Sequence, residues 1–331
     1  MGQLYPLKFE PIPHEMIWGG NSLQKYYNKP FPGGKNIGES WEISAVPGNI
    51  SVVANGHLKG NNLKELIEVY MDELVGEEVF NRFGVEFPLL IKLIDARDKL
   101  SVQVHPGDEL SARRHNGNGK TEMWYVLAAE NEPELISGFN RKVSSGIFME
   151  KLNSGRLLDI LNVEKVREGD VFFIPSGRVH AIGKGIILAE IQQTSDITYR
   201  IYDWDRVDEK GKPRELHIDL AMEAIDFEDC SDFKTTVKRK QNFPVLLADC
   251  EYFTTQLLTF RKDLVRDYSL IDSFVIYLCT KGEFIIECNG GPLTVQKGET
   301  VLIPSSIQDV KLTGKVESDL LEVYIRQVGL L

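Results

Sequence analysis

Polar residues alternate with valines in the stretch KLSVQVH (residues 99–105), where Ser101, Gln103 and His105 are separated by Val102 and Val104. On an extended strand, residues two apart project to the same face. A hydroxyl, an amide and an imidazole therefore share one face, while the valines fill the other. Because amide oxygens and imidazoles are common metal ligands, this face predicts a functional site rather than a core.

Two further residues complete a possible ligand set. Glu122 opens the strand-like stretch EMWYVL, and His180 follows the turn sequence IPSG. With Gln103 and His105 they form a nitrogen and oxygen set suited to zinc, or to manganese, iron, cobalt or nickel. The absence of thiolates from the set favours a catalytic ion over a structural one. The alternative is that each histidine is an ordinary hydrogen-bonded residue at a strand end.

Basic residues near these segments suit a phosphate group, which prefers charged donors. Lys92 lies inside the apolar stretch PLLIKLIDA (88–96), where an ammonium group needs an anionic partner or access to water. The full set is Lys92, Ser101, Lys120, Arg200 and Arg206. The alternative is that the two arginines only pair with nearby aspartates, namely Asp196, Asp203 and Asp205.

A single carboxylate interrupts another apolar stretch. Glu190 lies among isoleucine, leucine and alanine in GIILAEIQQTSD (185–196). Burial raises the pKa of a carboxyl group and a nearby cation lowers it, which suits a general acid or base. A purely structural ion pair with an arginine is the competing interpretation.

Short apolar-rich stretches bounded by turn residues dominate the chain and predict a mainly β protein. The expected strands span residues 39–46, 51–55, 88–96, 99–105, 122–129, 134–139, 170–176, 186–193, 253–260, 272–279, 283–289, 299–306 and 319–325. Helices are expected after Asn62, where Glu65 completes a capping box, at 144–162 with a break at Gly155, and at 217–227.

An internal repeat divides the chain. EGDVFFIPSGRVHAI (168–182) aligns with KGETVLIPSSIQDVK (297–311), which places Asp309 opposite His180. Any metal chemistry is therefore expected in the first unit. The polar stretch 228–241 is a plausible linker, and the expected domains are residues 1–235 and 236–331.

Composition bounds the function. The 331 residues include 42% hydrophobic ones, as in a globular protein, and the net charge of −11 argues against a nucleic-acid partner. No apolar run reaches the roughly 18 residues that span a bilayer, and the N-terminus lacks a signal-peptide pattern. The four cysteines form no C-x-x-C pair and are expected to be reduced. A cytoplasmic monomer or weak homodimer is expected.

Four motifs in order, SVQVHP, KTEMWYVL, IPSGRVHAIG and LAEIQQTSDITYRIYDWDR, resemble the type I phosphomannose isomerases in their short bacterial form. The resemblance extends over nearly the whole chain, including WGG (18–20) and GESWEIS (38–44). It implies a cupin fold: a metal-bearing jelly-roll barrel with helical insertions, followed by a second, degenerate barrel. It also implies isomerisation of mannose 6-phosphate to fructose 6-phosphate through a cis-enediol.

The resemblance assigns roles to individual residues. It implies one zinc ion per chain held by Gln103, His105, Glu122 and His180. Phosphate contacts fall on Ser101 and Lys92, the essential arginine on Arg200, and the proton-transfer residues on Lys120 or Glu190. Arg206 is assigned to the phosphate only by its spacing from Arg200, where longer family members have a lysine.

Two other function classes fit part of the pattern. A metal-dependent cupin dioxygenase would use iron with two histidines and a carboxylate, and a non-catalytic sugar-binding cupin would need neither Glu190 nor Arg200. The cationic set argues against the dioxygenase.

Overall fold

The structure is a computed structural model that describes residues 2–207, 210–228 and 233–326. The N-terminal inner sheet has the strand order β2 (Ile12–Gly20), β3 (Ile37–Ile43), β4 (Leu89–Ala96), β11 (Ile186–Gln193), β6 (Glu122–Ala129) and β9 (Val171–Ile174). The N-terminal outer sheet has the order β12 (Tyr199–Tyr202), β5 (Val102–Val104), β10 (His180–Ala181), β7 (Glu134–Phe139) and β8 (Leu161–Lys165).

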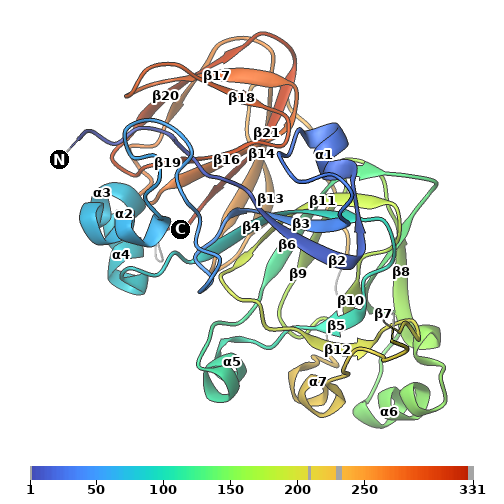
Figure 1. The fold of residues 1–331 in the computed structure, drawn as a ribbon. Coiled ribbons are helices and arrows are strands. Elements are labelled where there is room, and N and C mark those ends of the chain that lie inside the picture. The colour runs from blue at the N-terminus through green and yellow to red at the C-terminus, as the bar shows by residue number, and fades with distance from the viewer. Residues whose placement is uncertain (1, 208–209, 229–232, 327–331) are drawn as a thin grey trace.

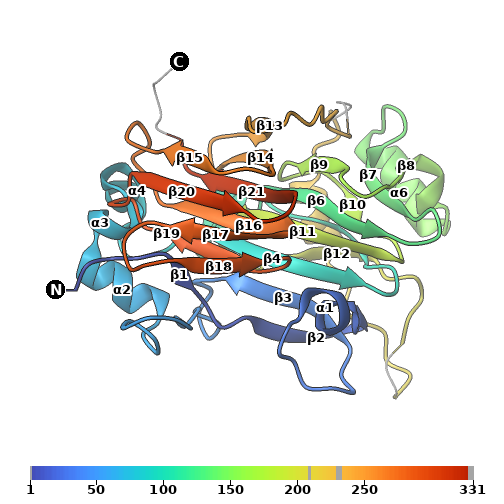
Figure 2. The same cartoon turned by 90° about the horizontal axis from the view of Figure 1, so that it is seen from above.

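Two further sheets form the part of the molecule that we call the C-terminal half, which consists of residues 245–324 together with β1. Apart from β1, which is blue, its strands are drawn in orange and red in Figure 1. The C-terminal inner sheet has the order β1 (Leu7–Lys8), β19 (Thr300–Ile303), β16 (Val275–Lys281), β21 (Ser318–Tyr324), β14 (Thr254–Phe260) and β13 (Val245–Asp249). The C-terminal outer sheet has the order β15 (Leu264–Asp267), β20 (Asp309–Gly314), β17 (Glu283–Glu287) and β18 (Leu293–Gln296). Figure 2 shows that many of these strands run along a common direction.

The main hydrophobic core lies between the two inner sheets. It includes Leu89, Ile91 and Leu93 of β4 together with Leu278 of β16 and Leu321 of β21, all nearly inaccessible to solvent. A smaller core joins the two C-terminal sheets, and others lie between and behind the N-terminal sheets. The predicted mainly β architecture is therefore confirmed.

Helices occupy the periphery. Their bounds are α1 (Ser22–Tyr27), α2 (Leu63–Tyr70), α3 (Asp72–Val75), α4 (Glu77–Phe83), α5 (Asp108–His115), α6 (Ser145–Asn153), the 3-10 helix η1 (Leu157–Ile160) and α7 (Ile218–Ala224). In Figure 1, α5, α6 and α7 gather at the end of the molecule remote from the C-terminal strands. The helix expected at 144–162 breaks at Gly155, as predicted, because this residue has a φ of +68°.

The internal repeat is confirmed by the strand pairing. β10 pairs with β5 so that His180 lies opposite Gln103, and β20 pairs with β15 so that Asp309 lies opposite Asp267. The C-terminal half thus repeats the geometry of the N-terminal half with aspartates at these two positions.

The N-terminal segment contributes to the C-terminal half. β1 pairs with β19, and the backbone amide of Phe274 donates to the carbonyl of Val75 at 3.1 Å. The domain boundary at 235/236 stays a prediction. Among the described residues, Cys250, Cys279 and Cys288 are free thiols, whereas Cys230 lies outside them. None of the described helices has the length and apolar character needed to cross a membrane.

The capping box at the start of α2 yields a stability prediction. Asn62 Oδ1 accepts from the amide of Glu65, and Glu65 Oε2 accepts from the amide of Asn62, both at 2.9 Å. Asn62→Ala is expected to lower the free energy of unfolding by about 1 kcal/mol. Urea denaturation should show a lower midpoint with an unchanged slope. Asn62→Asp should retain most of the stability; an equal loss in both variants would contradict the capping role.

Candidate active site

The inner-sheet strands carry charged side chains because their two faces have different neighbours. Residues 89, 91 and 93 of β4 enter the core between the inner sheets, so Lys92 faces the opposite side. The strand register places Lys92 opposite Glu190 of β11, and Glu190 opposite Trp124 of β6. Side chains from three adjacent strands therefore meet on the wall that faces the N-terminal outer sheet.

The sequence-predicted ligands His105, Glu122 and His180 converge. Each offers one ligand atom within 4.8 Å of the others, and all three side chains are buried. Glu122 Oε1 lies 3.4 Å from His180 Nε2 and has no hydrogen-bond partner among the described residues, while Glu122 Oε2 lies 3.6 Å from His105 Nε2. A buried carboxylate oxygen without a donor fits a site that receives a cation.

Backbone carbonyls fix the orientation of both imidazoles. The Nδ1 atoms of His105 and His180 lie 2.9 Å from the carbonyl oxygens of Ile197 and Arg178, respectively. A proton on each Nδ1 satisfies these contacts and leaves the Nε2 lone pairs directed to Glu122. This arrangement of a histidine donating to a carbonyl behind it is typical of metal ligands.

Gln103 and Lys120 join this cluster to the adjoining cavity. Gln103 Nε2 lies 3.3 Å from His180 Nε2, so ligation through its oxygen requires the amide to rotate by half a turn. Lys120 donates to Glu122 Oε2, and its Nζ lies 3.1 Å from His105 Nε2. The structure therefore brings all four predicted ligands together, with an ammonium group beside them.

Burial keeps the two imidazoles neutral. It lowers the pKa of His105 well below its usual value and the pKa of His180 to about 3. Burial, together with the negative charge of Glu190, raises the pKa of Glu122 to about 7. A divalent cation binds best to neutral imidazoles and to a carboxylate whose negative charge the nearby cations do not fully balance.

A second charged group lies beside the cluster. Glu190 Oε1 is 3.2 Å from Lys92 Nζ and 3.8 Å from Lys120 Nζ, and its Oε2 accepts from Trp124 Nε1 at 2.9 Å. Burial alone would raise the pKa of Glu190, but the two ammonium groups lower it to about 2. Burial alone would lower the pKa of Lys92, but the nearby carboxylates of Glu39 and Glu190 outweigh this effect and raise it.

These residues line a cavity of about 440 Å³. Its wall includes the predicted residues Lys92, Ser101, Gln103, Lys120, Glu190 and Arg200. Ser101 is buried. Arg200 donates to the carbonyl of Glu215 at 2.8 Å, while its buried Nε has no partner in the part of the chain that the structure describes. Four basic side chains face the cavity against the three carboxylates of Glu39, Glu190 and Asp196. A cavity with this excess of positive charge, next to a metal-type cluster, can bind a small anionic substrate and polarise it.

The structure does not bring Arg206 to this cavity. Arg206 instead donates to Asp203 and, at 2.6 Å, to the carbonyl of Lys99. Arg214 lines the cavity in its place, and its Nε donates to Asp203 Oδ2 at 2.7 Å. The aspartate pairing considered for Arg206 on sequence grounds is therefore present.

Other cavity residues escaped the sequence-based prediction. The ring of His14 lies against that of Trp41, tilted by 31° with centroids 4.1 Å apart, and its buried Nε2 has no partner within the described ranges. Trp41 Nε1 donates to Glu39 at 2.7 Å, and Lys92 lies over the Trp41 ring. His14 lies on β2, Glu39 and Trp41 lie on β3, and β3 pairs with the strand β4 that carries Lys92. The WGG and GESWEIS motifs were the available signal, but they gave no role to single residues.

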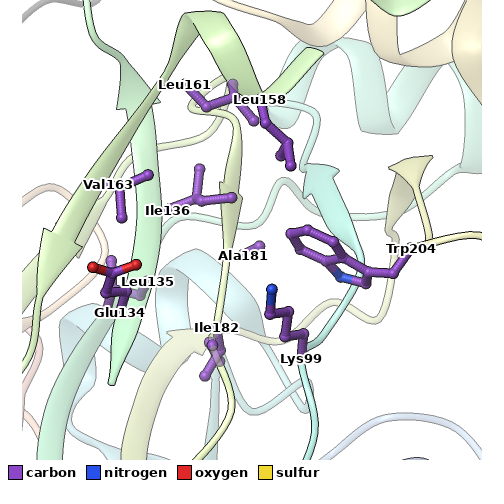
Figure 3. A pocket seen from close by; sticks show the side chains of 11 residues that line it. Lys99, Glu134, Leu135, Ile136, Leu158, Leu161, Val163, Ala181, Ile182 and Trp204 are labelled. Atoms are coloured by element: carbon purple, nitrogen blue, oxygen red, sulfur yellow. The ribbon is translucent and has the colours of Figure 1, made fainter. Parts of the chain in front are cut away.

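A second cavity lies close by, with Ile182 in the walls of both. Figure 3 shows its apolar walls, formed by residues such as Leu135, Leu158 and Val163, with Lys99 beside Trp204. None of the predicted site residues lines it. The predicted site residues therefore belong to the polar cavity and not to this apolar one.

Comparison with known proteins identifies the family. Residues 7–140 match the description "Phosphomannose isomerase type I, catalytic domain", and residues 242–322 match "Mannose-6-phosphate isomerase, cupin domain". The second match confirms the cupin fold expected from the resemblance.

Full-length relatives agree. The chain is 37% identical over 320 residues to the mannose-6-phosphate isomerase ManA of Bacillus subtilis (strain 168), covering 94% of this chain and 97% of that protein. It is 35% identical over 314 residues to the mannose-6-phosphate isomerase of Streptococcus mutans, covering 94% and 96%. The crystal structure of the mannose 6-phosphate isomerase from Bacillus subtilis matches with a TM-score of 0.87 at 32% identity, covering 97% of this chain and 100% of that one. The chain belongs to the type I phosphomannose isomerase family.

Proposed function

We propose that this chain is an aldose–ketose isomerase that interconverts mannose 6-phosphate and fructose 6-phosphate and uses one zinc ion per chain. The observation that carries the proposal is the convergence of His105, Glu122 and His180 beside a cavity with cationic walls. The names of the full-length relatives support the same reaction and substrate.

The four-residue set fits a catalytic metal. Gln103, His105, Glu122 and His180 would hold the ion, and two imidazoles with two oxygen ligands suit zinc. When bound, the ion would act as a Lewis acid on the sugar oxygens. Two of these residues, His105 and Glu122, also contact Lys120, whose other carboxylate partner is Glu190 at 3.8 Å.

The isomerisation moves a proton from C2 to C1 of the open-chain sugar through a cis-enediol. Lys120 and Glu190 were both candidates for the proton carrier. The contacts favour Lys120, because its Nζ lies beside the predicted ligands His105 and Glu122, whereas Glu190 is held by Lys92 and Trp124. In this role Lys120 must act as a neutral amine that accepts the C2 proton and returns it to C1. Glu190 then holds Lys92 and balances the cationic charge around it, and Arg200 stabilises the developing oxyanion.

The phosphate of the substrate requires charged donors away from the reacting carbons. We assign this contact to Ser101 and Lys92, with the Arg214 guanidinium in the role that spacing gave to Arg206. Arg206 supports it through Asp203, the carboxylate that both arginines share. A cytoplasmic location and a monomeric or weakly dimeric state stay predictions.

Metal removal tests the proposal against its rivals. Incubation with dipicolinate should abolish mannose 6-phosphate isomerisation, and added zinc should restore it, whereas a non-chelating isomer of the reagent should have no effect. A coupled assay for fructose 6-phosphate and elemental analysis give the two readouts.

Each rival makes a different prediction in the same experiment. Oxygen consumption restored only by iron would support a cupin dioxygenase. Binding of mannose 6-phosphate without turnover would support a non-catalytic sugar-binding protein. Full isomerase activity in metal-free protein would contradict the metal-dependent mechanism.

A further inference from the structure

The segment between His105 and Glu122 determines how the site is assembled. His105 follows β5, the chain then forms α5, and it returns through Gly119 to Lys120 and Glu122 at the start of β6. The contact of 3.1 Å between Lys120 Nζ and His105 Nε2 therefore depends on how the two ends of this segment are held together.

A single carboxylate joins the two ends. Asp108 Oδ1 accepts from the backbone amide of Gly119 at 2.7 Å and from Gln193 Nε2 at 2.9 Å. Gln193 Oε1 in turn accepts from the amide of Thr121 at 2.8 Å. Asp108 itself is exposed. It nevertheless holds Gly119 directly and Thr121 through Gln193, and these two residues flank Lys120 on both sides.

Close backbone contact reinforces the junction. A Cβ atom on Gly119 would lie 2.7 Å from both the backbone nitrogen and Oδ1 of Asp108. Only glycine allows the segment that leads through Lys120 into β6 to approach the first residue of α5 this closely. The amide of Lys120 also donates to the carbonyl of Pro106 at 3.2 Å.

The remaining oxygen of this carboxylate is bound by the C-terminal half. Tyr252, in the turn between β13 and β14, donates its hydroxyl to Asp108 Oδ2 at 2.7 Å. The turn is anchored because Phe253 is fully buried in the core between the inner sheets. Its carbonyl accepts from the amide of Cys250 at 3.0 Å. The Tyr252 hydroxyl is therefore held on a rigid support.

We propose that Tyr252 and Asp108 are positioning residues through which the C-terminal inner sheet holds Lys120 against the metal ligands, an inference that rests on the function proposed above. The C-terminal half thereby contributes to catalysis without contacting the substrate. Small displacements of a catalytic group reduce turnover strongly. The hydrogen bond between Tyr252 and Asp108 can therefore affect the rate by fixing the position of Lys120, although neither residue contacts the substrate.

The test compares hydroxyl removal at two tyrosines of the C-terminal half. Tyr252→Phe is expected to lower kcat about 3- to 10-fold, with KM, bound metal and thermal midpoint unchanged. Tyr324→Phe is the matched control, because its hydroxyl accepts from Gln256 at 3.3 Å and it has no contact with Asp108; it should keep the parental kcat.

Substitution of the carboxylate gives a second readout. Asp108→Ala should lower kcat about 10- to 100-fold and release metal faster to a chromogenic chelator. Asp108→Asn keeps an oxygen for Gly119 and Gln193 and should recover most of both properties.

The outcomes separate this inference from the proposed function. A parental kcat in Tyr252→Phe, or a loss that only follows a fall in thermal stability, would overturn the positioning role while leaving the isomerase assignment intact. An inactive parent enzyme would instead remove the proposed function itself.

Discussion

Glu122→Gln is expected to reduce mannose 6-phosphate isomerisation by about 10³-fold or more and to leave little bound metal. Glu122 supplies the only carboxylate among the three clustered residues, and no described residue donates a hydrogen bond to its Oε1. The substitution removes the negative charge that balances a divalent cation. A catalytic metal lowers the activation barrier by several kcal/mol, so its loss slows the reaction strongly. His180→Ala should have the same effect, because its Nε2 faces the same centre.

The measurement pairs metal content with turnover. Elemental analysis of the purified variants gives the metal per chain, and the coupled assay gives kcat. Glu42→Gln is a suitable control, because Glu42 is also a buried glutamate of the N-terminal inner sheet but pairs with Lys29 at 2.6 Å. It should keep its metal. Full metal content in Glu122→Gln and His180→Ala would remove both residues from the ligand set.

The convergence of the four proposed ligands was predictable from sequence because strands have a simple period. Alternation in KLSVQVH placed Gln103 on the same face as His105, and the structure keeps that face toward His180. The strands 122–129, 134–139 and 186–193 were expected with the bounds that β6, β7 and β11 have. Buried charges such as Lys92 also stood out, because an ammonium group in an apolar strand needs a partner.

Strand pairing and helix positions were less accessible. The partner of Lys92 is Glu190, on a strand almost a hundred residues away, and only the register of β4 with β11 identifies it. Helix α5 was missed because its sequence DELSARRH has no apolar stripe; Ser111 is its only buried residue. The expected strand at 51–55 is reduced to isolated bridges at Val52 and Val53.

The choice between Arg206 and Arg214 shows where spacing fails. β12 ends at Tyr202. Just beyond it, Trp204 and Asp205 have φ values of +58° and +54°. A left-handed turn reverses the direction of the chain, so counting from Arg200 no longer predicts which way a side chain points. The contact between Asp108 and Tyr252 had no sequence signal either, because 144 residues separate its partners.

Arg200→Ala is expected to keep the metal but to lower kcat about 10²- to 10³-fold. Arg200 lines the cavity from the N-terminal outer sheet, and its register partner on β5 is the predicted ligand Gln103. Its buried Nε has no partner among the described residues, so a donor is available for charge that develops on the substrate. Removing one such preorganised donor commonly costs about 3–4 kcal/mol in the transition state.

The arginine outside the cavity is the matched control for this prediction. Arg206→Ala removes a guanidinium bound to Asp203 but leaves Arg214 on the same carboxylate. We expect less than about a 5-fold change in kcat, since Arg206 does not line the cavity and Arg214 keeps its own contact with Asp203. Near-normal turnover in Arg200→Ala would exclude it from the mechanism. A loss in Arg206→Ala as large as in Arg200→Ala would instead show that Arg206 acts on the phosphate, as its spacing in the sequence first suggested.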